Sequence, residues 1–230
     1  MSTNEEELRA LICDICNKVW QKGWVAANDG NVSVKIDDDT FLCTPTGISK
    51  SFITPDKLIK INAAGEILES NGDYRPSSEI KMHLRCYQDR DDVGAVLHAH
   101  PPVATAFALA HLPLDSYSLI ESAIVIGSIP IASFGIPSTN EVPDSIAPFL
   151  PEHDVILLEN HGALAVGSDL ITAYYRMETL ELVANTQYHA RMLLGGEQEA
   201  EIPRETLEKL FALRPNYGVT GRHPGYKKYC

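Results

Sequence analysis

Hydrophobic residues recur at helical spacing in two long segments of the chain. The first segment predicts an amphipathic helix over residues 5–22, and the second predicts a helix over residues 170–194 that ends at Gly195-Gly196. Two shorter helices are expected over about residues 79–88 and 103–110. The long helices each place one apolar face toward the rest of the protein, so they predict helical layers around a common core.

Shorter apolar runs between these helices predict strands. They cover residues 32–36, 41–43, 58–62, 66–68, 93–100, 124–131, 155–158 and 163–166. Because several of these strands are joined by short turns, the sheet should be largely antiparallel, in an α/β layered arrangement. No repeat or linker interrupts the chain, so we expect a single domain over residues 1–230, with a C-terminal tail from about residue 197.

Composition and charge narrow the possible partners. The formal net charge is −12 and the pI is near 5.0, so the chain lacks the basic field that a nucleic-acid partner requires. No window approaches the roughly 20 apolar residues of a membrane span, which predicts no membrane partner. The first residues are polar and acidic, unlike a secretory or mitochondrial leader, and the five cysteines are scattered. We therefore expect a cytoplasmic protein.

Three histidines follow or end predicted strands. In His98-Ala99-His100 the two imidazoles project from the same face of a strand and can bind one ion. His161 lies in the segment Glu159-Asn160-His161-Gly162, straight after the apolar run 155–158, and Gly162 would let the backbone turn so that the ring faces a cleft. Each motif alone also fits ordinary hydrogen-bonded histidines. Together they predict a catalytic zinc site with a free fourth position.

Glu79 is the candidate acid. It lies at a predicted helix start after Ser77 and Ser78, where a serine N-cap, hydroxyl groups and free N–H groups would favour a phosphate. The alternative is an exposed first-turn carboxylate that stabilises the helix dipole. His83 lies four residues later on the same helical face, and we rank it as structural or as a support of the site.

Five short segments of this chain, in this order, resemble the class II aldolase/adducin family. They are Gly30-Asn31-Val32-Ser33, Thr44-Pro45-Thr46-Gly47, Pro76-Ser77-Ser78-Glu79, His98-Ala99-His100 and His161-Gly162. Each segment is short, but five in the right order are specific. The resemblance implies a three-layer α/β/α fold with a central, mainly antiparallel sheet, and a cyclic homotetramer with active sites shared between subunits.

The resemblance also implies the roles of individual residues. One Zn²⁺ per subunit would be held by His98, His100, His161 and Glu79, and Mn²⁺ or Co²⁺ is also possible because imidazole and carboxylate accept all three. Glu79 would in addition act as the acid/base. The positions that match the family's phosphate site are Gly30, Asn31, Thr46, Gly47, Ser77 and Ser78.

A tyrosine from a neighbouring subunit completes the site in these aldolases. Tyr117 matches that position and would transfer the proton of the hydroxyl that becomes the aldehyde. A second tyrosine of the family comes from the C-terminal tail, where Tyr217, Tyr226 and Tyr229 are candidates without a clear match.

The implied activity is cleavage of a small phosphorylated sugar, a ketose 1-phosphate such as L-fuculose 1-phosphate, to dihydroxyacetone phosphate and an aldehyde such as L-lactaldehyde. Aldolases for 5-deoxyribulose or 5-methylthioribulose 1-phosphate share the same motifs, and a methylthioribulose 1-phosphate dehydratase is a more remote possibility. L-ribulose-5-phosphate 4-epimerases usually carry Asp where this chain has Glu79. A non-enzymatic adducin-like module lacks the intact ligand set.

Overall fold

The computed structural model describes residues 5–219 of the 230-residue chain. Its strands are β1 (Asn31–Lys35), β2 (Thr40–Cys43), β3 (Ile59–Asn62), β4 (Ile67–Glu69), β5 (Ala95–Ala99), β6 (Ile131–Ala132), β7 (Val155–Leu158) and β8 (Gly162–Gly167). They form one eight-stranded sheet in the order β4-β3-β2-β1-β5-β8-β7-β6. Neighbouring strands are antiparallel except β6 and β7, so the predicted mainly antiparallel sheet is confirmed.

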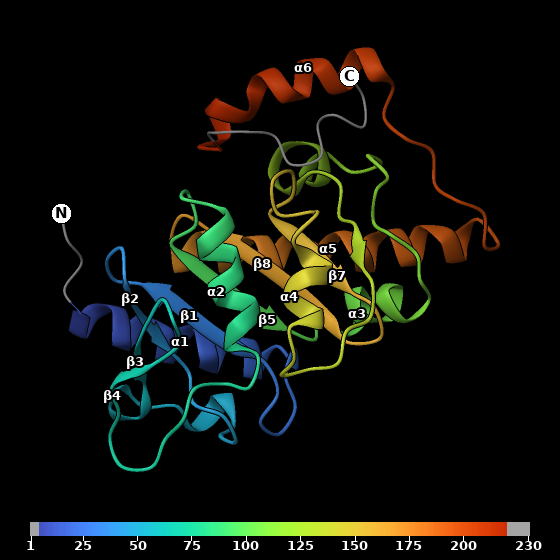
Figure 1. Ribbon diagram of the computed structural model, residues 1–230. Helices are drawn as coiled ribbons and strands as arrows, with labels where there is room; N and C mark the ends of the chain where they lie inside the picture. Colours follow the sequence, from blue (N-terminus) through green and yellow to red (C-terminus); the bar gives the residue numbers. More distant parts are fainter. Residues whose placement is uncertain (1–4, 220–230) are drawn as a thin grey trace.

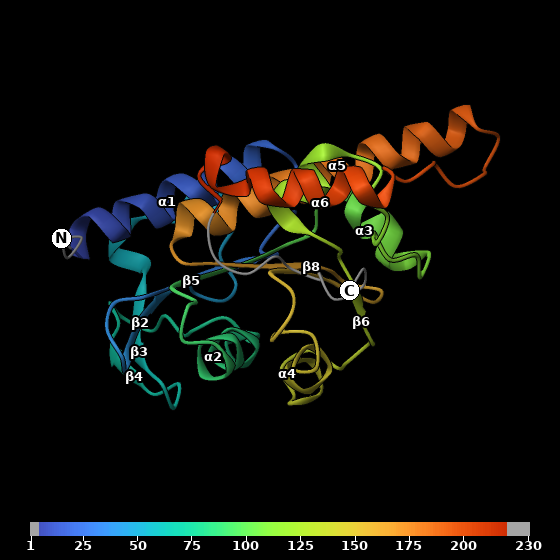
Figure 2. The same ribbon diagram turned by 90° about the horizontal axis from the view of Figure 1, so that it is seen from above.

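Helices cover both faces of the sheet. They are α1 (Glu5–Gln21), α2 (Ile80–Asp89), α3 (Pro102–Leu109), α4 (Glu141–Ile146), α5 (Leu170–Leu193) and α6 (Arg204–Leu213). Figure 1 shows the sheet crossed by α2 and α4 in front and by α5 behind. Turned by 90°, the sheet is seen between α1, α3 and α5 on one side and α2 and α4 on the other (Figure 2). The architecture is the expected three-layer α/β/α arrangement.

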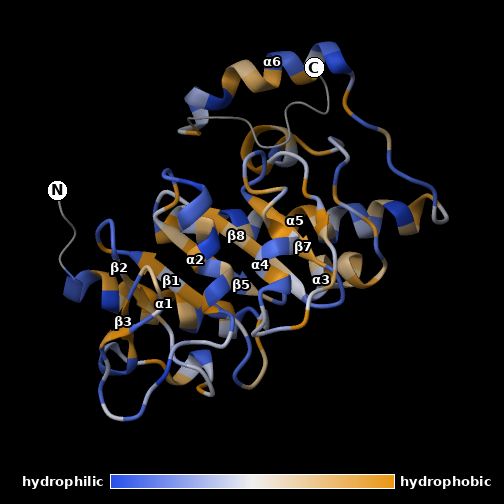
Figure 3. Ribbon diagram, viewed as in Figure 1, coloured by the Kyte–Doolittle hydropathy of each residue, from blue (hydrophilic) through white to orange (hydrophobic). Residues whose placement is uncertain are grey.

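Each layer of helices closes its own hydrophobic core against the sheet. The larger core includes Ile12 of α1, Leu97 of β5 and Leu180 of α5, and the smaller includes Met82 of α2 and Ile146 of α4. The central strands are therefore apolar on both faces, as the hydrophobic colour of β5, β7 and β8 shows in Figure 3. None of the helices within residues 5–219 combines the length and the apolar character that a membrane crossing demands.

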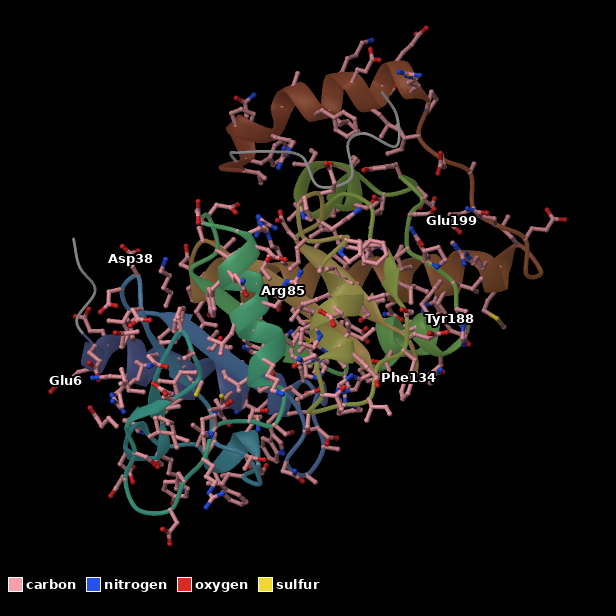
Figure 4. The ribbon with its side chains drawn as sticks, viewed as in Figure 1. Glu6, Asp38, Arg85, Phe134, Tyr188 and Glu199 are labelled. Atoms are coloured by element: carbon pink, nitrogen blue, oxygen red, sulfur yellow. The ribbon has the colours of Figure 1, made fainter. Side chains whose placement is uncertain are left out.

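Ion pairs connect the helical layers to the sheet, and α2 to α4 within one layer. Asp154 immediately precedes β7. Its Oδ1 lies 2.7 Å from Arg90 Nη1 at the end of α2, and its Oδ2 lies 2.9 Å from Arg176 Nη2 of α5. Asp154 therefore joins both helical layers to the sheet. Arg85, labelled on α2 in Figure 4, is 3.2 Å from Asp144 Oδ1 of α4. These contacts hold α2, the helix that follows Glu79, on the sheet.

One predicted strand is wrong. Residues 124–131 do not form a continuous strand: a π-helical turn covers Ser122–Ile126, Gly127 takes a positive φ of 70°, and only the short β6 follows. Part of this turn was predicted as strand. The side chains concerned pack into or against the cores; they are Ile124, Val125 and Ile126. An apolar run of this length has no period that separates a buried strand from a buried helix.

Two helices were not predicted. The short α4 is mostly polar in sequence, and α6 lies in the segment from about residue 197 that we expected as a tail. Leu207 of α6 is buried against Tyr117 and against Ala123, which is part of the π-helical turn. The segment after α5 thus folds back onto the body of the protein.

Candidate functional site

The three histidines converge because of the register of the central strands. His98 in β5 pairs with Asn31 of β1 on one side and with Leu164 of β8 on the other. His161 immediately precedes β8, and His100 immediately follows β5. The neighbouring ends of two central strands, β5 and β8, therefore bring the three histidines together.

Possible ligand nitrogens of His98, His100 and His161 all lie within 4.8 Å of one another. His98 Nδ1 lies 2.9 Å from the carbonyl oxygen of Ala163, which can only accept, so Nδ1 carries the hydrogen and Nε2 faces the cluster. His98 Nε2 is 3.1 Å from His100 Nε2. A backbone partner of this kind fixes the ring orientation of a metal-binding histidine.

Glu79 lies beside this cluster. The structure makes Glu79 itself the N-cap residue of α2, one position before the first helical residue, whereas we expected a serine there; Ser77 Oγ accepts a hydrogen bond from the Glu79 N–H. Glu79 Oε2 is 3.2 Å from His98 Nε2, and Oε1 is 3.4 Å from His161 Nε2. Oε1 is buried and accepts no hydrogen bond. The carboxylate is thus part of the cluster and has one oxygen to spare.

Burial and charge set the protonation of these groups. Burial would raise the pKa of Glu79, but His98 and His161 lower it by more, so the pKa lies well below its usual range and the group is a carboxylate. Burial, reinforced by the neighbouring histidines, lowers the pKa of His100 to about 3 and also lowers that of His161. At His98, burial alone would lower the pKa. The neighbouring Glu79 carboxylate raises it by more, so the pKa of His98 lies above its usual value.

The residues present fit a divalent cation. Neutral imidazoles and a carboxylate are the ligands of catalytic zinc sites, and a cation would satisfy the orphaned Oε1 of Glu79. The donor set is equally compatible with other divalent transition metals. All four predicted ligands are therefore brought together by the structure.

Gly162 is needed for a reason that differs from our expectation. Its φ is not positive; the left-handed residue of this turn is Asn160, with a φ of 54°. A Cβ on Gly162 would lie 2.4 Å from His100 Cδ2 and 2.7 Å from the Ala99 carbonyl oxygen. The glycine gives room to the His100 ring, so a larger residue would displace a ligand.

A small polar pocket of about 140 Å³ is lined in part by His100, His161 and Glu79. Its lining includes most of the residues that we predicted for a phosphate: Gly30, Asn31, Thr46, Ser77 and Ser78. Gly47 is in the same turn, exposed and with a φ of 75°, but it does not line the pocket. Phosphate binding by these residues stays a prediction.

Lys50 fixes the loops around this pocket and was not anticipated. Its side chain is buried, with 2% of the residue exposed, and Nζ donates to the carbonyl oxygens of Asn28 at 3.3 Å and Ile48 at 3.0 Å. Burial lowers the pKa of Lys50. Its hydrogen bonds go to these two backbone carbonyls, and the Asp29 carboxylate attracts the charge from farther away. Sequence alone gives no sign that this lysine is buried.

Gly30 also has a packing role at this edge. Its φ is 71°, and a Cβ would lie 2.5 Å from Val25 Cγ1 and 3.0 Å from the His98 carbonyl oxygen. The loop before β1 can approach the ligand strand β5 this closely only with glycine.

Tyr117 is not brought to the cluster of its own chain. It is 0% exposed and packs beneath α6, with its ring centroid 5.9 Å from that of Phe211. Burial raises the pKa of Tyr117 to about 12. Its predicted service to a neighbouring subunit stays a prediction. Tyr217 is exposed, and Tyr226 and Tyr229 lie outside the described residues.

The family model described as "Class II Aldolase and Adducin N-terminal domain" matches residues 10–188. The chain therefore belongs to the class II aldolase and adducin family, as the five motifs indicated.

The curated relatives of the chain include two kinds of enzyme. An L-fuculose phosphate aldolase of Methanococcus maripaludis is 31% identical over 174 residues, which cover 76% of this chain and 92% of the relative. A 3-oxo-tetronate 4-phosphate decarboxylase of Escherichia coli strain K12 is 31% identical over 185 residues, covering 78% and 85%. A solved structure of L-fuculose 1-phosphate aldolase superposes with a TM-score of 0.81 at 28% identity, covering 90% of this chain and 95% of that one.

Proposed function

We propose that this protein is a metal-dependent lyase that cleaves a ketose 1-phosphate, such as L-fuculose 1-phosphate, to dihydroxyacetone phosphate and an aldehyde such as L-lactaldehyde. The observation that carries the proposal is the group of three histidines and Glu79, directly beside the polar pocket. The similarity to L-fuculose phosphate aldolases supports the choice of substrate.

The metal in this proposal is one divalent cation per chain, taken to be Zn²⁺. His98, His100, His161 and Glu79 would hold it. When bound, such a cation polarises the carbonyl and stabilises the negative charge that develops as the carbon–carbon bond breaks. No lysine is needed for this chemistry.

The protein side chains divide the remaining tasks. The pocket residues Ser77 and Ser78, with the amides of the neighbouring turns, would hold the phosphate and so fix the distance from the phosphate to the carbonyl. Glu79, an anion with one free oxygen, would move the proton at the carbon next to the carbonyl. The free oxygen is on the side of His161, which also lines the pocket.

The similarity to decarboxylases supports a second candidate, release of CO₂ from a 3-oxo acid phosphate. Both candidate substrates carry a phosphate ester on one carbon next to a ketone and a hydroxyl group on the carbon at the other side of the ketone. In both reactions a bond to this hydroxyl-bearing carbon breaks. The electron pair left behind gives the same enediolate of dihydroxyacetone phosphate. The same pocket and cation would therefore serve both reactions, which differ only in the departing group.

A substrate panel separates these candidates. The protein, loaded with Zn²⁺, is incubated with L-fuculose 1-phosphate, 5-deoxyribulose 1-phosphate, 5-methylthioribulose 1-phosphate, L-ribulose 5-phosphate and 3-oxo-tetronate 4-phosphate. Dihydroxyacetone phosphate, aldehyde and CO₂ are measured. We expect dihydroxyacetone phosphate with an equal amount of aldehyde from a ketose 1-phosphate. If the oxo acid instead gives CO₂ and dihydroxyacetone phosphate in equal amounts, and no ketose gives an aldehyde, the second candidate is established.

The role of Glu79 is tested by Glu79→Gln, which keeps the size of the side chain and removes its basicity. Turnover should fall by about 100-fold or more, because general acid–base catalysis contributes at least that much. The affinity for the product dihydroxyacetone phosphate, measured by competition, should stay within about threefold of the wild-type affinity. Near-normal turnover would exclude Glu79 as the proton carrier.

The assembly and location belong to the same proposal. We infer a cytoplasmic homotetramer in which Tyr117 or another tyrosine reaches the site of a neighbouring subunit. The pocket of one chain, about 140 Å³, is smaller than the 300 Å³ or more that is usual for small-molecule sites, which supports completion by a second chain. Native mass spectrometry should show four chains, and a monomer at assay concentration would exclude a shared site.

A further inference from the structure

A line of buried polar side chains extends behind Glu79, away from the histidine cluster. Asn31 and Ser33 lie on one face of β1, two residues apart, and His83 and Tyr87 lie on one face of α2, four residues apart. All four are buried, with exposed fractions from 0% for Ser33 to 8% for Tyr87. Buried polar groups in this number require an account of their partners.

Each of these side chains contacts the next. Asn31 Nδ2 donates to Glu79 Oε2 at 3.0 Å, and Asn31 Oδ1 is hydrogen-bonded to His83 Nε2. Ser33 Oγ lies 2.7 Å from His83 Nδ1 and 2.8 Å from Tyr87 Oη. The line is therefore continuous from Tyr87 to the carboxylate.

Only one direction of donation satisfies every contact. A carboxylate accepts, so the amide nitrogen of Asn31 must face Glu79 and its oxygen must face His83. His83 Nε2 must then donate. Burial lowers the pKa of His83 to about 3, so the ring is neutral at pH 7 and its Nδ1 accepts. Ser33 consequently donates to His83 and accepts from Tyr87.

We propose that His83 is a positioning residue, which holds the Asn31 amide against Glu79 Oε2 and thereby leaves Oε1 free to face the metal and the substrate. This inference rests on the proposed function of Glu79. Without the His83 bond, the Asn31 amide can rotate and place its oxygen against the carboxylate, which repels it. Oε1 is the buried oxygen that accepts no hydrogen bond, so the orientation of the carboxylate determines the site.

The line of contacts does not carry protons. An amide lies between His83 and Glu79, and an amide nitrogen does not release its hydrogen under neutral conditions. The structure thus assigns His83 an orienting role, through Asn31, and not a role as acid or base. It also commits the Asn31 oxygen and one amide hydrogen, which leaves at most one Asn31 hydrogen for a phosphate.

The test compares His83→Phe with His83→Gln. Phe fills the space without a donor, whereas Gln offers an amide N–H toward Asn31. We expect His83→Phe to lower kcat by about 100-fold with KM within about threefold, and His83→Gln to regain at least tenfold of that loss. Cys86→Ala, a buried position on the same helix, is the control for packing and should keep its kcat. Equal activity of the two His83 variants would overturn the inference.

A second readout needs no substrate. Co²⁺ affinity is measured by chelator competition, with the visible absorption spectrum, for wild type, His83→Phe, Glu79→Gln and the double variant. His83→Phe should weaken Co²⁺ binding by about 10-fold or more, as losses of supporting contacts do. In the Glu79→Gln background it should have no further effect, because His83 acts through Glu79. Additive losses would overturn the inference.

The outcomes separate the two proposals. If wild type binds no Co²⁺ and cleaves no sugar phosphate, the proposed function fails, and with it this inference. If wild type binds Co²⁺ and turns over while His83→Phe does the same, only the inference fails. Should His83→Phe not fold, Asn31→Ala removes the adjacent link and is expected to show the same losses of kcat and Co²⁺ affinity; unchanged values would count against the proposal.

Discussion

Gly162 shows how a residue without a side chain shapes the site. A methyl group at this position would lie 2.4 Å from the His100 ring and 2.7 Å from the Ala99 carbonyl oxygen. Both neighbours belong to the end of β5, where the ligands are, and neither can move without disturbing the histidine cluster. The absence of a Cβ is therefore as much a part of the site as the imidazoles.

We expect Gly162→Ala to weaken Zn²⁺ binding by about 10–100-fold, the range known for changes that misorient a ligand. Gly167→Ala is the matched control at the other end of β8, where a Cβ would lie 2.5 Å from Ala173 N. Both variants should unfold at lower temperature, but only Gly162→Ala should lose metal affinity in a chelator competition. Equal Zn²⁺ affinity in the two variants would show that Gly162 does not control the ligands.

Lys50 provides a second test at the scale of one residue. Its buried Nζ holds the carbonyls of Asn28 and Ile48, on the two loops beside the polar pocket. Lys50→Met keeps the length and removes the charge. The free energy of unfolding should change little, by about 1 kcal/mol, because burying the ammonium already carries a desolvation cost.

The substrate KM and the affinity for inorganic phosphate should, in contrast, worsen by about 10-fold in Lys50→Met. Lys57→Met is the control, since it makes the same change of net charge at a lysine that donates to Phe52 O in a solvent-exposed contact. If the two variants bind phosphate equally well, Lys50 does not support the pocket.

At the scale of elements, α6 is a helix that we did not predict from the sequence. Two of its side chains, Leu207 and Phe211, pack over Tyr117, and Leu207 is only 1% exposed. Leu207, Leu210 and Phe211 recur at helical spacing, but the helix has only ten residues, and we read this short segment as part of a tail. The helix is stabilised by the surface on which it packs rather than by its own composition.

Leu207→Ala should loosen this helix, because truncating a buried leucine costs about 2–5 kcal/mol. Hydrogen exchange should accelerate in α6 and around Tyr117, measured by mass spectrometry of the corresponding peptides. Leu213→Ala, on the same helix but 39% exposed, should change the exchange little. Equal protection in the two variants would mean that Leu207 does not hold α6 in place.

The elements that the sequence did predict are those with a strong local signal. The strand pairs β1–β2 and β3–β4 are bounded by turn residues such as Asp37-Asp38-Asp39, and α1 and α5 have clear apolar periodicity. The segment 124–131 lacked such a signal. Its β-branched residues favour a strand locally, but packing from several sides, together with Gly127, produces a π-helical turn instead.

For the molecule as a whole, the metal ligands could be predicted because three short motifs identify them. Their convergence depends on the sheet order β1-β5-β8, which sequence patterns do not contain. The supporting groups were harder to find: the spacing of Glu79 and His83 was visible, but the contact of His83 with Asn31 requires β1 beside α2. The buried position of Lys50 likewise follows only from the assembled loops.

The whole account depends on one divalent cation held by His98, His100 and His161. The most direct measurement is the Zn²⁺ content per chain after chelation, reloading and gel filtration, for wild type, His98→Ala and the control His189→Ala on the exposed face of α5. We predict one Zn²⁺ per chain in wild type and His189→Ala, and loss of stable binding in His98→Ala. Full Zn²⁺ retention by His98→Ala, or no binding by wild type, would contradict the account.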